Sequence, residues 1–251
     1  MITIVTSFNE KGFNQYGKNF IASFIKYWPL DISLLVYAEG VHPAIKTENI
    51  TVKSLLDESP RCNDFLIRHK GNKASQGAAV LNTQRKWKNK EILKNYNFRY
   101  DAYKFCRKPF AIQSAMDYST GKLFWIDADV ITTKPIKDGL LDILLPDDKD
   151  FCYLGRESAH SECGFMGFNL ENNSSRQLIN QVADIYDTDE VFDIYEWHDS
   201  YIYDHVRLKM GKDITTKDIS IEPRRGHVFD KSILGEYMMH LKGDLKLRSV
   251  G

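Results

Sequence analysis

The sequence lacks several features that would assign it directly to a class of function. Its 251 residues include no apolar run close to the roughly 18 residues that a membrane-spanning helix needs. Basic and acidic residues both number 34, so there is no basic excess of the kind that proteins of long nucleic acids usually carry. A Gly-rich Walker loop, a Gly-x-Ser-x-Gly elbow and a zinc-binding helix motif are also missing. We therefore expect neither a membrane span nor a nucleic-acid partner.

Cysteines are few, and they are scattered along the chain. The four are Cys62, Cys106, Cys152 and Cys163, and no two form a Cys-x-x-Cys pair. This pattern favours free thiols in a reducing compartment over disulfides or a zinc site. The chain opens on a short β-branched run, without the charged and long apolar regions of a signal peptide. We therefore expect a cytoplasmic protein.

What the sequence does contain is an alternation of strands and helices. A hydrophobic share of 43% is ample for a core, and the length suits one elaborate domain. The β-branched run at 2–7 predicts a strand, apolar residues at helical spacing predict a helix over 12–28, and 32–38 predicts a second strand. Strand, helix and strand within forty residues indicate a βαβ unit with parallel strands, and hence an α/β fold.

The rest of the chain continues this alternation. The segment 62–97 fits it least, because loop signals alternate there with a polar, basic stretch; we predict a solvent-facing insertion, with residues 83–96 at helical spacing. Elsewhere the patterns predict helices at 100–118, 138–145, 174–186 and 196–208, and strands at 123–126, 151–154 and 163–170.

Two carboxylates interrupt an apolar strand near the middle of the chain, in the stretch Leu-Phe-Trp-Ile-Asp-Ala-Asp-Val at 123–130. Asp127 and Asp129 share a face at the carboxyl end of that strand, where α/β sheets bind ligands. Like charges this close destabilise each other unless a cation lies between them, and Mg²⁺ or Mn²⁺ accepts carboxylate and phosphate oxygens. We therefore predict a Mn²⁺ (or Mg²⁺) site; the alternative is a pair of loop carboxylates that cap the following helix.

This stretch, with the N-terminal βαβ unit, resembles the GT-A fold glycosyltransferases. The resemblance implies a Rossmann-like, mixed but mainly parallel sheet flanked by helices, in which the Asp-x-Asp motif holds a divalent metal on the diphosphate of a nucleotide sugar. It also implies a single domain over 1–251, with a nucleotide-sugar-binding half at 1–130 and an acceptor-side half with a closing tail at 131–251. Thr6, Ser7 and Ala128 would then bind the donor.

A second motif, His-Leu-Lys-Gly-Asp-Leu-Lys at 240–246, resembles the closing His-x-x-Gly-x-x-Lys motif of retaining family 8 enzymes. By this resemblance, His240 is the third metal ligand, and Gly243 and Lys246 meet the donor phosphates. The chemistry is consistent, because glycine lets the backbone approach a phosphate and lysine neutralises its charge.

Further resemblances concern the sugar substrates. Trp197, His198 and Asp199 resemble the Trp-His-Asp-Glu-Ser segment of retaining family 6 enzymes, which implies acceptor contacts for Trp197 and His198 and a place near the anomeric carbon for Asp199. The alternative is a helix in which Trp197 packs against Tyr201. Gly164, in Glu-Cys-Gly-Phe-Met-Gly-Phe-Asn at 162–169, would let an acceptor sugar approach, or it marks a bulge in a packed strand.

Basic and acidic residues stand at the start of the helix predicted at 100–118, which precedes the Asp-x-Asp strand. Arg99, Asp101 and Lys104 match positions that reach the nucleotide sugar in many GT-A enzymes, although an exposed ion pair explains Asp101 and Lys104 equally well.

These patterns together predict a metal-dependent glycosyltransferase that moves a sugar from a nucleotide sugar, UDP-linked by preference, to a hydroxyl of a glycan or other acceptor. Resemblance to families 6 and 8 favours retention at the anomeric carbon. Two alternatives stay open. A sugar-nucleotide nucleotidyltransferase usually carries a Gly-rich basic loop after its first strand, whereas residues 8–13 here contain one glycine. A non-catalytic sugar-binding relative would not need the complete set of Asp127, Asp129, His240 and Lys246.

Overall fold

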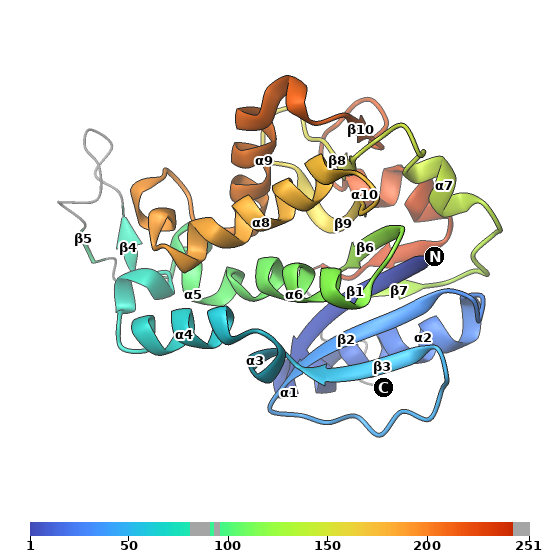
Figure 1. Cartoon of the computed structure of the whole chain (residues 1–251), viewed down its shortest axis with the longest axis horizontal. Helices are drawn as coiled ribbons and strands as arrows, with labels where there is room; N and C mark the ends of the chain where they lie inside the picture. Colours follow the sequence, from blue (N-terminus) through green and yellow to red (C-terminus); the bar gives the residue numbers. More distant parts are fainter. Residues whose placement is uncertain (81–90, 93–95, 243–251) are drawn as a thin grey trace.

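A seven-stranded sheet organises the computed structural model, which describes residues 1–80, 91–92 and 96–242 (Figure 1). The strand order is β10-β8-β9-β6-β1-β2-β3, with β9 antiparallel to both β6 and β8 and the other pairs parallel. This confirms the predicted mixed, mainly parallel α/β sheet. The strands are β1 Ile2–Asn9, β2 Ser33–Glu39, β3 Ile50–Ser54, β6 Lys122–Ile126, β8 Phe151–Leu154, β9 Glu162–Asn169 and β10 Thr216–Asp218.

Two short strand pairs lie outside this sheet. Strand β7 (Val130–Thr132) pairs antiparallel with β11 (Met238–His240), and β4 (Ala79–Val80) pairs antiparallel with β5 (Glu91–Ile92). The register of the first pair places His240 opposite Val130. A residue far along the chain is thereby brought next to the Asp-x-Asp segment.

Helices cover both faces of the sheet. The α-helices are α1 Glu10–Gly12, α2 Lys18–Tyr27, α3 Leu55–Glu58, α4 Pro60–His69, α5 Ala102–Phe105, α6 Arg107–Ala115, α7 Leu140–Leu144, α8 Asn173–Asp187, α9 Asp199–Met210 and α10 Val228–Lys231. A π-helical stretch, Phe13–Gly17, joins α1 to α2, and 3₁₀ turns occupy Lys73–Gln76, Phe98–Tyr100, Met116–Tyr118, Glu190–Asp193, Gly211–Asp213 and Ile233–Glu236. Helices α4, α5, α6, α8 and α9 pack on one face, and α2, α7 and α10 pack on the other (Figure 1).

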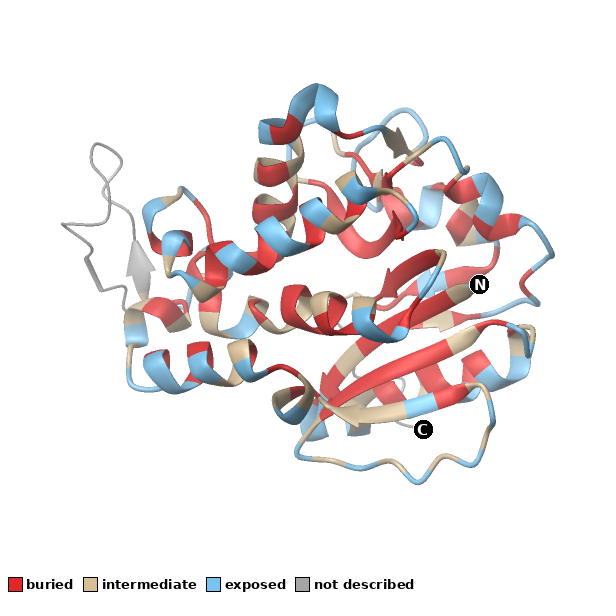
Figure 2. Ribbon diagram, viewed as in Figure 1, coloured by how far each residue is buried: buried red, intermediate tan, exposed pale blue. Residues whose placement is uncertain are grey.

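Alternating side chains of the central strands fill two separate cores. On β6, Leu123 and Trp125 enter the core under α6 and α8, whereas Phe124 and Ile126 enter the core under α2 and α7. Because successive side chains of a strand point to opposite faces, a strand buried on both faces must be apolar throughout. Figure 2 accordingly shows β6 as almost entirely buried, while α8 alternates buried and exposed surfaces.

The segment 62–97 differs from its prediction. Residues 60–69 form α4, whose Cys62 and Phe65 are fully buried, so this part belongs to the core and is not a solvent-facing insertion. The helix start has a sequence signal, since Ser59 accepts from the backbone N–H of Cys62 and Pro60 stands in the first turn. Residues 91–92 form a strand where helical spacing was predicted. The remainder of that stretch, 81–90 and 93–95, lies outside the described residues.

The helix predicted at 196–208 begins later, at Asp199. His198 has extended backbone angles, and the N–H of Trp197 donates to the carbonyl of Arg99, a neighbour in space and not in sequence. This tertiary bond keeps residues 196–198 out of the helix, against their local spacing. Trp197 and Tyr201 therefore do not form the helical pair that was considered as the alternative to acceptor binding.

No helix within the described ranges is long and apolar enough to cross a membrane.

The close packing around Gly167 on β9, at the centre of the sheet, leads to a prediction about stability. A Cβ at this position would lie 2.6 Å from Cε1 of Phe124 and 2.7 Å from Sγ of Cys152. We expect Gly167→Ala to lower the free energy of unfolding by about 1–3 kcal/mol through overpacking, measured by urea denaturation. Gly71→Ala is the control, because a Cβ there meets nothing within 4 Å. Equal stability of the two variants would contradict the described packing.

Candidate active site

A cleft of about 370 Å³ opens at the carboxyl ends of β1 and β6. This is the edge at which parallel α/β sheets place their ligands, because the loops that follow the strands diverge there. Residues from several elements converge on it. They include Ser7, Tyr16, Glu39, Lys104, Lys108, Trp125, Asp127, Ala128, Asp129, Glu162, Gly164 and Asp199.

Three predicted metal ligands come together at one side of this cleft. The ligand atoms of Asp127, Asp129 and His240 all lie within 4.8 Å of one another, and Nε2 of His240 is 3.1 Å from Oδ1 of Asp129. The β7–β11 pair produces this approach, and the N–H of Leu241 also donates to the carbonyl of Asp129. Two carboxylates and an imidazole suit Mn²⁺ or Mg²⁺ completed by phosphate oxygens, so the residues present fit the predicted metal.

Two neighbouring residues border the ring of His240. Oε1 of Glu162 lies 3.7 Å from Nδ1 of His240, a separation longer than a hydrogen bond. Glu162 also forms ion pairs with Arg156 and Lys242. The ring needs the absence of a side chain at Gly164, where a Cβ would lie 2.6 Å from Cε1 of His240. Gly164 therefore lines the cleft and makes room for a candidate metal ligand.

Lys108, on α6, was missed by the sequence reasoning. Its Nζ lies 2.8 Å from Oδ1 of Asp127 and 2.5 Å from Oδ2 of Asp199, and it donates to the carbonyl of Cys163 at 2.9 Å. A signal was present, because Lys108 stands three residues after Phe105 and four before Ile112, on the apolar side of the helix predicted at 100–118. A cation on an apolar face needs a partner, and here it has two carboxylates.

Lys108 and Asp199 stabilise each other's charged forms. Burial lowers the pKa of Lys108, but Asp127 and Asp199 outweigh that effect and raise the pKa above its ordinary range. Burial raises the pKa of Asp199, which is 5% exposed, but Lys108 outweighs it and holds that pKa below the usual value. Both groups are therefore charged at neutral pH. Asp127 also accepts from Nε1 of Trp125 at 2.6 Å, again through Oδ1, so Oδ2 is the oxygen that can bind a metal.

Tyr16 places a phenol beside the carboxylates. Burial raises its pKa to about 12, and Asp129 and then Asp127 add to the effect. The hydroxyl is therefore protonated at neutral pH, and Tyr16 lines the cleft.

The predicted donor-binding residues divide into two groups. Ser7, Lys104 and Ala128 line the cleft, whereas Thr6 is fully buried in β1. Asp101 accepts from the backbone N–H of Lys104 at 2.9 Å and from the hydroxyl of Tyr96 at 2.9 Å, so it caps α5 and does not form the exposed ion pair considered as an alternative.

Arg99 lies apart from the cleft lining, with its side chain 54% exposed and its Nη1 3.5 Å from Oε1 of Glu196. The other two predicted donor residues, Gly243 and Lys246, lie outside the described residues.

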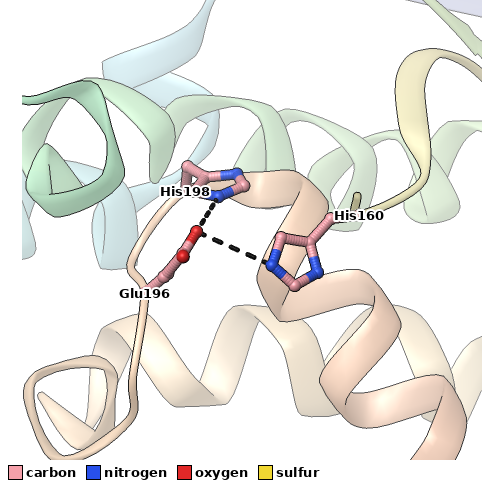
Figure 3. Close-up of side chains that lie close together, drawn as sticks. All are labelled: His160, Glu196 and His198. Atoms are coloured by element: carbon pink, nitrogen blue, oxygen red, sulfur yellow. Dashed lines mark hydrogen bonds and ion pairs between the residues drawn. The ribbon is translucent and has the colours of Figure 1, made fainter. Parts of the chain in front are cut away.

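The predicted acceptor platform at Trp197 is wrong for this structure. Its ring is 0% exposed and packs edge-on against Tyr100 and Phe192, with centroid separations of 5.3 and 5.2 Å. A ring enclosed in the core cannot offer a face to a sugar. His198 is also buried, and its Nε2 lies 2.8 Å from Oε2 of Glu196, away from the cleft lining (Figure 3).

Several solved structures are similar to this chain in fold. A glycosyltransferase involved in the glycosylation of the major capsid of PBCV-1 aligns over 98% of this chain and 98% of its own, with 12% identity and a TM-score of 0.50. Mouse xyloside xylosyltransferase 1, in its apo form, aligns over 88% of this chain and 86% of its own, with 10% identity and a TM-score of 0.48. The bifunctional glycosyltransferase WbbM aligns over 76% of this chain, with 13% identity and a TM-score of 0.39, and this chain covers 37% of its length.

The strand order and the likeness to the PBCV-1 enzyme define the class of fold: the chain has the GT-A-type glycosyltransferase fold. Its version is the Rossmann-like, mainly parallel mixed sheet flanked by helices that the sequence predicted. At 12% identity this likeness concerns the fold. No protein-family model matches the sequence, and no curated protein sequence matches it.

The buried charges predict a large effect for Lys108→Met, which keeps the side-chain length but removes the cation. We expect the free energy of unfolding at pH 7 to fall by about 3–5 kcal/mol. Without Lys108, burial should raise the pKa of Asp199 in the folded protein above its value in the unfolded chain. The folded state is then destabilised at every pH at which Asp199 is ionised in the unfolded chain. The loss should therefore shrink as the pH falls below about 4, where the carboxyl binds its proton in both states.

Urea denaturation across pH measures this effect, with Lys104→Met as the control because Lys104 is exposed one turn earlier in the chain. In an Asp199→Asn background, the same lysine replacement should cost less. An identical loss in both backgrounds, or no change with pH, would show that Lys108 and Asp199 are not coupled.

Proposed function

We propose that the protein is a metal-dependent glycosyltransferase that transfers a sugar from a nucleotide sugar to an acceptor hydroxyl. One observation carries the proposal: two carboxylates and an imidazole converge at the carboxyl edge of β6, in a cleft of a GT-A-type fold. The donor preference for a UDP-sugar and the retention of anomeric configuration come from the sequence resemblances to families 6 and 8. The two halves, 1–130 and 131–251, would bind the donor and the acceptor.

Asp127, Asp129 and His240 would hold Mn²⁺ or Mg²⁺. When bound, the metal supplies Lewis-acid neutralisation of the charge that develops on the leaving diphosphate. The protein's own residues prepare the site for it. Lys108 and Trp125 fix the Asp127 carboxylate through Oδ1, and the β7–β11 pairing places His240 beside Asp129. Rigid ligands of this kind reduce the reorganisation needed on binding.

The remaining residues of the cleft would bind the donor. Ser7 and Ala128 line it from the ends of β1 and β6, and Lys104 adds an exposed positive charge suited to a phosphate. Tyr16, protonated at neutral pH, lines the same cleft. Gly243 and Lys246 stay candidates for the phosphates on the strength of the sequence motif.

Asp199 is the candidate catalytic residue. It borders the cleft from the first turn of α9, and Lys108 keeps it ionised. An ionised carboxylate at this place can accept a hydrogen bond from a sugar hydroxyl or stabilise positive charge at the anomeric carbon as the bond to the diphosphate breaks. Its fixed ion pair with Lys108 holds the carboxylate in one position while this happens.

The proposed metal role is tested by Asp129→Asn, and in parallel by Asp127→Asn. We expect either change to abolish transfer, and a chelator to abolish it in the native protein, because the asparagine amide is a weaker ligand for a hard cation. The measurement is nucleotide release across UDP-, GDP- and CMP-sugars with Mn²⁺. Asp138→Asn is the matched control, at an exposed position outside the cleft lining. Activity that persists in chelator would refute metal dependence.

The role of Asp199 is tested by Asp199→Asn, which preserves size and removes charge. We expect turnover to fall at least about a hundredfold, some 2.7 kcal/mol of transition-state stabilisation, while nucleotide affinity is retained. Steady-state kinetics with the best donor, together with nucleotide titration, separate the two quantities. Asp213→Asn serves as the control, since Asp213 is exposed after the end of α9. Near-normal turnover, or loss of nucleotide binding, would remove Asp199 from this role.

A further inference from the structure

A second group of metal-ligating side chains lies outside the cleft. His160 stands in the loop before β9, and Glu196 and His198 stand in the extended segment before α9 (Figure 3). Their ligand atoms all lie within 4.8 Å of one another. None of the three lines the cleft, and no function described above uses them.

The distances within this group are close to those of a tetrahedral zinc site. Oε2 of Glu196 lies 2.8 Å from Nε2 of His198 and 3.6 Å from Nε2 of His160, and the carboxylate oxygen points between the two rings (Figure 3). Zinc bonds of about 2.0–2.2 Å at tetrahedral angles separate ligand atoms by roughly 3.3–3.5 Å. Small side-chain adjustments would therefore bring all three atoms to coordinating distance.

Burial and charge favour a cation at this place. Glu196 is 4% exposed, and a carboxylate this deeply buried needs compensating charge. Its cationic neighbour among the described residues is Arg99, whose Nη1 lies 3.5 Å from Oε1, while the two imidazoles approach Oε2. The side chain of His160 is 37% exposed, so the group is open on one side. That open side gives a metal its entry path and leaves a fourth position for water.

The ring of His160 is bordered by an aromatic ring and a carboxylate. Tyr201 packs edge-on against His160 at a centroid separation of 4.9 Å, and Oδ2 of Asp204 lies 4.0 Å from Nδ1 of the same ring. Asp204 is itself fixed, because it accepts from the backbone N–H and the hydroxyl of Ser161. A carboxylate behind the non-coordinating nitrogen is the usual partner of a metal-binding histidine.

We propose that His160, Glu196 and His198 form a Zn²⁺ site that is separate from the Asp127, Asp129 and His240 group. Two imidazole nitrogens and one carboxylate match the borderline-soft zinc ion, whereas the oxygen-rich group in the cleft suits Mn²⁺ or Mg²⁺. The bound ion would tie the loop before β9 to the segment that leads into Asp199, the first residue of α9. This site does not depend on the proposed sugar transfer.

The test uses the full chain carrying Asp127→Asn and Asp129→Asn, so that the cleft cannot bind zinc in the native manner. Zinc chloride is titrated against a chromophoric chelator, and Co²⁺ serves as a spectroscopic substitute. We expect one tight zinc per chain, no displacement by millimolar Mg²⁺, and the intense visible absorption of four-coordinate Co²⁺. His160→Ala should weaken zinc binding at least about a hundredfold, and Asp204→Asn should weaken it about 10–100-fold, as for a partner that orients a ligand.

His205→Ala is the matched control, because His205 lies on α9 with its ring stacked on Tyr201 and is not a member of the group. It should bind zinc as tightly as the parent chain. Because the side chain of His160 is 37% exposed, replacing it should disturb folding less than replacing the buried Glu196 or His198. The melting temperature measured without metal checks this. Three results would overturn the proposal: no tight zinc in the Asp127→Asn, Asp129→Asn chain, equal affinity in the His160→Ala and parent chains, or equal losses in the His160→Ala and His205→Ala chains.

Discussion

The ammonium group of Lys108 sits between two carboxylates, Asp127 and Asp199, which come from distant parts of the chain and different sides of the cleft. An uncompensated charge at such a depth would cost several kcal/mol, so each partner requires the others. The helix that carries Lys108 is thereby locked to the end of β6 and to the start of α9. The cleft keeps its shape because separating these elements would leave a buried charge without its ion-pair partner.

The two aspartates of the Asp-x-Asp segment are positioned by different contacts. Asp127 is turned by Lys108 and Trp125, whereas Asp129 faces His240 across the β7–β11 pair. One carboxylate is thus positioned by a cation on a helix and the other by a strand pairing. Asp127 and Asp129 lie in the turn between β6 and β7, and these two structural supports hold that turn from different sides.

Much of this could be predicted from the sequence, where local patterns and tertiary structure agree. The apolar strand interrupted by Asp127 and Asp129 indicated a ligand-binding edge, and resemblance to the family 8 closing motif implied that His240 belongs there; the structure brings all three together. The α/β class followed from the alternation of strand and helix patterns. Strand β8 matched its prediction at both ends, because apolar residues and turn signals delimit it clearly.

The parts that escaped prediction are those decided by tertiary contacts. Trp197 looked like a platform beside His198, but a backbone bond to Arg99 and an aromatic pocket draw it into the core. Lys108 is invisible to motif reasoning, since its importance comes from carboxylates far away in sequence. His160 likewise gains its meaning only when β9 and α9 are packed together, which places it beside Glu196. A single sequence shows which residues share a face, but not which faces meet.

The pairing of β7 with β11 has a consequence for biosynthesis. His240 lies 111 positions after Asp129 in the chain, yet the two side chains are in contact. During translation the Asp-x-Asp strand leaves the ribosome long before its imidazole partner exists, and domains fold while they emerge. A chain that stops before β11 would therefore hold two carboxylates without the imidazole. Completion of the site thus coincides with synthesis of this strand, so a truncated product would be folded in part and chemically incomplete.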